Sequence, residues 1–127
     1  MDNKENTYQQ LQSHFNKIGE LENIAEIAYW DEATMMPEGS GEARGKSLAT
    51  LSGVIHELKT DIKIRDWLLE SEGNNSLDLW QKANVFEIRR IFDECSAIPV
   101  DLTKKLEERS FQSEQAWRRC RSANDWT

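Results

Sequence analysis

Apolar residues recur every three or four positions along most of this chain, the spacing that places them on one face of a helix. The first such stretch begins near Asp2 or Asn3, either of which can cap a helix, and runs to about Trp30. Its predicted buried stripe is Tyr8, Leu11, Phe15, Ile18, Leu21, Ala25 and Ala28, widened by Ile24 and Ile27. At about 1.5 Å per residue, such a helix must lie across more than one partner.

Four shorter helices are predicted after it, separated by residues that end helices at 37–41, 60–61, 72–76 and Pro99. Ser40 is the expected cap of the second helix, and the fourth should run from about Leu77 to Cys95. Their predicted core positions are Ala43, Ser47, Leu51, Val54, Ile55 and Leu58 with Leu48 at the edge; Ile62, Ile64, Leu68 and Leu69; Trp80, Ala83, Ile88, Ile91, Phe92 and Cys95; and Leu102, Leu106, Ser113, Ala116, Trp117 and Cys120. No stretch alternates apolar and polar residues long enough for a strand. The prediction is an all-α bundle of about five helices with a long N-terminal helix and no sheet.

Length and composition narrow the class of protein. The 127 residues suit one helical domain spanning 1–127. No apolar run approaches the roughly 20 residues that a membrane span needs, and the N-terminus lacks the pattern of a signal peptide. We therefore expect a cytoplasmic protein without membrane contact. Cys95 and Cys120 agree, because both fall on apolar helix faces and are expected to be buried and reduced.

The net charge of −7 disfavours a nucleic-acid partner, which needs a basic face to neutralise phosphates. Positive charge does gather near the C-terminus, at Lys104, Lys105, Arg109, Arg118, Arg119 and Arg121. Acidic residues at 101, 107, 108 and 114 dilute it. A solvated helix face is the favoured interpretation.

The segment from Trp30 to Pro37 stands out, because a connection between helices more often consists of a few small polar residues. Taken by its chemistry alone, the segment is more readily structural than functional. Trp30 would then be the last core-facing residue of the first helix, and Asp31 and Thr34 would cap the second.

Candidate chemistry elsewhere fails on spacing. His56-Glu57 resembles the start of a zinc-protease helix, but the position of the second histidine is Thr60. The other histidine, His14, lies on a different helix, and neither histidine has a glutamate three residues before it. We expect no metal site here and a His56 that is partly exposed or hydrogen-bonded. No serine or cysteine is placed as a nucleophile either.

The order of the segments carries a resemblance. Tyr8, Leu11, Phe15 and Ile18 lead into Trp30-Asp31, Thr34-Met35-Met36-Pro37 and Ala43-Arg44, followed by Leu48-Ala49, His56-Glu57, Phe86-Glu87-Ile88-Arg89-Arg90, Ile98-Pro99 and Trp117. This succession, from about residue 7 onward, resembles the N-terminal region of the carboxypeptidase Taq family of zinc metallocarboxypeptidases. The residues assigned to the family signature, in a structural role, are Trp30, Asp31, Thr34, Met36, Pro37, Arg44 and Trp117.

The resemblance implies an all-helical enzyme several times longer than this chain and usually homodimeric. Such enzymes remove single amino acids from peptide C-termini with water activated by zinc or cobalt. The family's zinc helix and third ligand lie downstream and have no counterpart here, so neither a catalytic nor a metal-binding residue is assigned, and no cofactor is expected on this chain. The region present here is similar to a helical cover on one side of the substrate groove.

The leading hypothesis is a non-catalytic N-terminal part of such a carboxypeptidase, which meets peptide substrate only in a full-length enzyme. The chain's ending inside a segment that continues in the family favours truncation. The alternative is a free-standing helical interaction module derived from the family. Both hypotheses predict exposed apolar stripes and self-association, as a homodimer or larger assembly.

Overall fold

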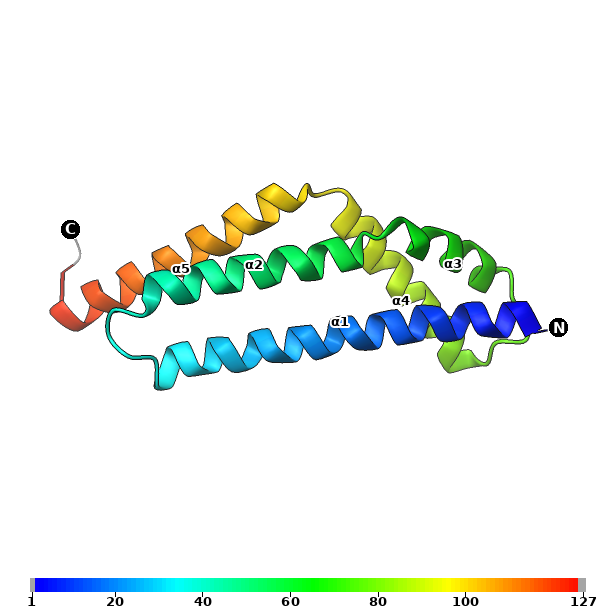
Figure 1. Cartoon of the computed structure of the whole chain (residues 1–127), viewed down its shortest axis with the longest axis horizontal. Coiled ribbons are helices and arrows are strands. Elements are labelled where there is room, and N and C mark those ends of the chain that lie inside the picture. Colours follow the sequence, from blue (N-terminus) through cyan, green and yellow to red (C-terminus); the bar gives the residue numbers. More distant parts are fainter. Residues whose placement is uncertain (1, 126–127) are drawn as a thin grey trace.

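The chain folds into five helices in the computed structural model, which describes residues 2–125 (Figure 1). These are α1 (Asp2–Thr34), α2 (Gly41–Lys59), α3 (Ile62–Glu72), α4 (Leu79–Ser96) and α5 (Val100–Ala123). The described residues contain no strand, so the all-α prediction with a long first helix is confirmed. None of the helices in this part of the chain is both long and apolar enough to cross a bilayer.

The helices form an elongated arrangement with α1 running along most of its length and the end of α5 extending beyond it (Figure 1). α2 turns back along α1 and packs against α5 on its other side, whereas α3 and α4 pack at the end where α1 begins. α1 therefore contacts α3 near its first half and α2 beside its second half. The two ends of the molecule are built from different sets of helices.

Local sequence explains where the helices start. The Asp61 side chain accepts a hydrogen bond from the backbone of Lys63 and caps α3. Asp78 and Gln81 form a reciprocal capping box at the start of α4. Ser40 holds the cap position of α2 but makes no side-chain capping bond. The side chains of Asp2 and Asn3, the predicted caps of the first helix, lie outside the described residues.

The apolar core lies between the first half of α1, α3 and α4. Its buried members are Tyr8, Leu11, Ile64, Leu68, Leu77, Val85, Ile88 and Phe92, with Phe15 and Trp67 packed against them. Further buried side chains, Ile18, Leu48 and Phe111, lie closer to the other end. Leu48 was expected at the edge of its stripe but is almost completely buried.

Many predicted core positions are exposed instead. They are Ile24, Ile27, Ala43, Ser47, Val54, Ile62, Leu69, Trp80, Ala83, Leu102, Leu106, Ser113 and Trp117. These positions lie on helix faces that no other described helix covers, because each helix of so small a set meets only some of its neighbours. Cys95 and Cys120 were expected to be buried and reduced; they are free, but they are only half-buried.

Candidate functional site

The corner between α1 and α2 is organised by an ion pair between Asp31 and Arg44. Arg44 Nη2 lies 2.6 Å from Asp31 Oδ2, and Arg44 Nη1 donates to the carbonyl oxygen of Ala28 at 3.0 Å. One guanidinium thus binds a carboxylate and a backbone carbonyl of the same helix. The planar, forked donor set of arginine suits this double contact better than the single nitrogen of a lysine.

The end of α1 is closed by the backbone of Asp31. Its carbonyl oxygen accepts hydrogen bonds from the N–H groups of both Met35 and Met36, each at 2.8 Å. α1 consequently ends at Thr34, four residues beyond the predicted end at Trp30. The chain then passes Pro37 and turns at Gly39, whose φ of 87° is a conformation that favours glycine.

The signature residues do not all have the roles expected of them. Trp30 is 63% exposed and does not face the core. Asp31 and Thr34 do not cap α2, because Asp31 pairs with Arg44 and the Thr34 hydroxyl donates back to the carbonyl oxygen of Trp30. Only its pairing with Arg44 distinguishes Asp31 from a simple capping residue. That pairing spans thirteen residues and crosses a loop, so helical periodicity cannot reveal it.

Of the remaining signature residues, two lie in the loop at this corner and one lies on α5. Met36 is half-buried and Pro37 is exposed in the loop between α1 and α2. Trp117 lies on α5, where the Arg121 guanidinium stacks 5.1 Å from the centre of its ring. The structure therefore brings Asp31, Arg44 and Met36 together, whereas Trp117 contributes to a separate surface.

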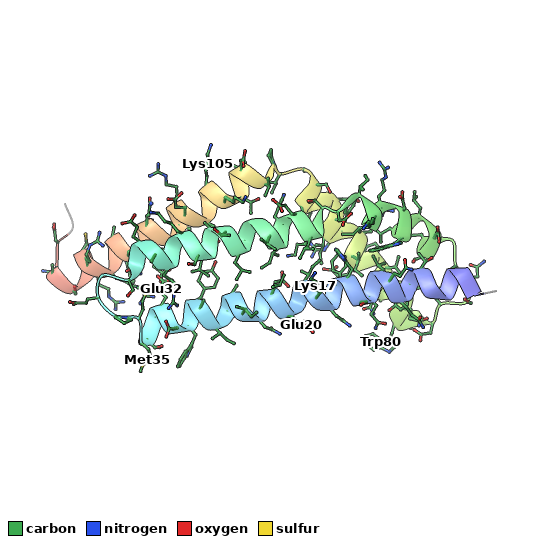
Figure 2. The ribbon with its side chains drawn as sticks, viewed as in Figure 1. Lys17, Glu20, Glu32, Met35, Trp80 and Lys105 are labelled. Carbon is green, nitrogen blue, oxygen red and sulfur yellow. The ribbon has the colours of Figure 1, made fainter. Side chains whose placement is uncertain are left out.

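Two side chains of α1 reach α5 near the same corner. The Tyr29 hydroxyl donates to Glu107 Oε1, and Gln115 Nε2 donates to Glu32 Oε1 at 2.6 Å. Figure 2 shows Glu32 on the side of α1 that faces α2, with Met35 projecting the opposite way. These four residues were not predicted from the sequence. The members of the two pairs are 78 and 83 positions apart, and polar residues show no periodic pattern that would mark them.

Burial changes the acidity of both α1 groups. Burial raises the pKa of the Glu32 carboxyl, and the hydrogen bond from Gln115 and the charges of Arg118 and Arg44 oppose this only in part. Burial and the hydrogen bond to Glu107 also raise the pKa of the Tyr29 hydroxyl. The Tyr29 hydroxyl therefore keeps the proton that it donates to Glu107 to a higher pH than an ordinary tyrosine does.

A hollow of about 430 Å³ lies between α2 and α5 beside the corner. Gly41, Gly45, Phe111, Gln115 and Arg119 are among its lining residues. The floor is tight, because a Cβ added to Gly45 would lie 2.9 Å from Cδ1 of Phe111. Gly45 therefore allows the close approach of the two helices.

Both histidines are engaged by protein groups. His14 Nε2 donates to the carbonyl oxygen of Leu58 at 2.7 Å, and its ring meets that of Trp67 edge to face. His56 is buried and its Nδ1 shares a hydrogen bond of 3.3 Å with the Thr103 hydroxyl. The expectation of a hydrogen-bonded His56 is thus confirmed.

A metal ion finds no ligand set in this part of the molecule. Within residues 2–125 no group of three or more His, Cys, Asp or Glu side chains is arranged to hold one. The corner contains an ion pair, three further hydrogen bonds between helices and a hollow, but no described side chain is placed as a nucleophile beside a base. Its geometry can hold helices and shape a surface.

Comparison with known proteins agrees with the architecture. Residues 10–127 match the family model described as carboxypeptidase Taq (M32) metallopeptidase. This match places the chain in the metallopeptidase class. The chain belongs to the carboxypeptidase Taq (M32) family, and the resemblance found in the sequence is confirmed.

Two relatives make the match concrete. Thermostable carboxypeptidase 1 of Thermus thermophilus is 31% identical over 125 residues, which cover 96% of this chain and 24% of the relative. The solved structure of Trypanosoma cruzi metallocarboxypeptidase 1 superposes with a TM-score of 0.76 at 30% identity, covering 95% of this chain and 24% of that one. The chain thus spans about a quarter of the length of both relatives.

Proposed function

We propose that this chain is the N-terminal helical part of a metal-dependent carboxypeptidase that removes C-terminal amino acids from peptides, and that it is non-catalytic by itself. The observation that carries the proposal is the shared fold. The same helical arrangement occurs within a metallocarboxypeptidase chain about four times longer. In this proposal the helices cover one side of the substrate groove, while zinc or cobalt and its ligands belong to the other three quarters of the enzyme.

The corner suits such a covering role. Asp31, Arg44, Tyr29 and Glu32 tie the end of α1 to both α2 and α5 through directional contacts. A wall built in this way keeps its surface in one geometry, which favours repeated binding of extended substrates. When bound elsewhere in the enzyme, the metal would supply the activated water that attacks the peptide bond.

An assay with a blocked dipeptide, in zinc- or cobalt-supplemented buffer, tests the non-catalytic part of the proposal. The purified chain is expected to release no C-terminal amino acid above the rate of a heat-denatured sample. Thermostable carboxypeptidase 1 of Thermus thermophilus serves as the positive control. Metal-dependent turnover by the isolated chain would overturn the proposal.

We further propose that the chain works in a reducing compartment and self-associates. Free Cys95 and Cys120 support a reducing compartment such as the cytoplasm. Exposed apolar side chains on α1 and α5 support self-association. Light scattering at micromolar concentration tests the second point, and a stable monomer would contradict it.

A further inference from the structure

The first two turns of α4 carry an apolar patch, defined here by Leu79, Trp80, Ala83 and Phe86. Leu79, Trp80 and Phe86 are 82%, 78% and 73% exposed, the highest values among the large apolar side chains described. Positions 79, 83 and 86 follow helical spacing and share one face, with Trp80 beside them. Figure 2 shows Trp80 projecting away from the ribbon.

This patch is a second apolar face on a helix that already has one. Val85, Ile88 and Phe92 bury the opposite side of α4 in the core. A surface helix with one partner needs a single apolar stripe, so the second face indicates a second partner. The patch also ends sharply, because the exposed positions that follow it on α4 include Glu87, Arg90 and Glu94, and Arg90 forms ion pairs with both glutamates.

We infer that the α4 patch docks against the part of an M32 polypeptide that this chain does not contain, and this inference rests on the proposed function. About three quarters of each relative lies outside the matched region, and the same fold occurs within one of those longer chains. The partner is therefore a large body that can offer an apolar surface beside the first turns of α4.

The size of the patch favours this occupant over a second copy of the chain. A large aromatic side chain buries about 150–250 Å², so Leu79, Trp80 and Phe86 together offer on the order of 500 Å². A stable dimer needs roughly 800 Å² from each partner. The patch is thus too small to hold two copies together, but it suits one section of a broader contact with a much larger body.

Copurification tests the inference with the full chain. A tagged chain is coexpressed with Thermus thermophilus carboxypeptidase from which the matching quarter has been deleted. We expect the unaltered chain to copurify with this partner, and Trp80→Gln/Phe86→Gln to copurify at least about 10-fold less, because buried aromatic anchors dominate such contacts. Leu102→Gln/Leu106→Gln, which changes exposed apolar residues of α5, should stay within about twofold and is the matched control.

Folding of the variants is checked by circular dichroism and thermal unfolding of the chain alone. Because these side chains are exposed, their substitution should change the Tm by less than about 2 °C. Ala83→Glu is the second variant, since it places a charge in the patch without removing a contact from the folded chain. It should reduce copurification in the same direction.

The outcomes separate the inference from the proposed function. If the patch variants copurify as well as the unaltered chain, the inference is wrong and the proposed function stands. If the unaltered chain fails to copurify while the deleted Thermus segment succeeds in its place, both fail. A dimer in sedimentation that Trp80→Gln/Phe86→Gln converts to monomers would identify a second copy as the occupant and overturn the inference.

Discussion

Where α3 and α4 meet the first half of α1, apolar side chains from three helices close into one core. Where α2 and α5 meet the second half of α1, the contacts between α1 and its neighbours include an ion pair and two side-chain hydrogen bonds. The first end is stabilised by burial, which tolerates small shifts in position. The second depends on directional contacts that fail when a helix rotates or slides. The apolar end therefore supplies most of the stability, whereas the polar end fixes the relative positions of α1, α2 and α5.

The largest effect should come from the apolar end. Leu68→Ala removes a fully buried side chain from the core and is expected to lower the free energy of unfolding by about 2 to 5 kcal/mol. Urea unfolding followed by circular dichroism measures it. Leu69→Ala, one residue away but exposed, should cost less than about 1 kcal/mol. Equal losses for the two variants would show that this end has no closed core.

Glycines at the contact of α2 and α5 give the next effect. Gly45→Ala forces Phe111 to move, and overpacking of about 1 to 3 kcal/mol should exceed the gain of roughly 1 kcal/mol in helix propensity. Gly53→Ala meets only the flexible side chain of Lys104, from Cγ to Cε, which can move into solvent, so it should be neutral or stabilising by up to about 1 kcal/mol. Thermal unfolding of both variants checks the opposite signs, and a stabilising Gly45→Ala would contradict the close approach.

Loss of the corner ion pair should have a smaller effect. Arg44→Ala removes the contacts to Asp31 and to the Ala28 carbonyl, which are partly exposed, and should cost about 1 kcal/mol. Arg44→Lys should recover only part of this, since lysine has a single donor nitrogen in place of the two guanidinium nitrogens that make the two bonds. Arg65→Ala, an exposed arginine on α3, is the control in the same urea titration. If Arg44→Ala costs no more stability than the control, the ion pair does not stabilise the corner.

The smallest effect concerns pH. Because the folded-state pKa of Glu32 is raised above its ordinary value of 4.5, the folded chain binds a proton more readily than the unfolded chain between those two values. The contribution of Glu32 to stability is therefore greatest below pH 4.5 and decreases as pH rises through the folded pKa. Glu32→Gln removes this loss and can still accept from Gln115, so it should stabilise the chain at pH 7 by less than about 1 kcal/mol.

Unfolding at several pH values measures that difference. The advantage of Glu32→Gln over the unaltered chain should shrink toward acid pH. Glu38→Gln, an exposed loop variant, is the control and should show no comparable trend. An advantage that grows on acidification would contradict the assigned direction of the pKa.

Helical spacing was sufficient to predict the five helices, because loop residues such as Gly39 and Pro99 interrupt an otherwise regular pattern. It could not predict which apolar residues are buried. The spacing that buries Leu68 also fits Trp80, and only the positions of neighbouring helices separate the two. An apolar residue that no described helix covers looks the same in sequence as a core residue.

The polar contacts of the corner were hidden for a different reason. Glu32 and Gln115 are far apart in sequence, and nothing in their local neighbourhoods distinguishes them from surface residues. Asp31 and Arg44 were singled out through the family resemblance, but their contact with each other was not predicted. Directional pairs between distant segments require the fold before they can be assigned.

Because α1 is one unbroken helix, its length fixes both the distance and the rotation between the two ends of the molecule. Each residue adds about 1.5 Å and rotates the helix by about 100°, so inserting one residue between Ile18 and Ala28 would swing Asp31 away from Arg44 while leaving Leu11 in place. Inserting seven would nearly restore the azimuth but carry the acid about 10 Å past its partner. Neither change can satisfy both ends at once, so the number of residues in α1 is itself part of the information that specifies the corner.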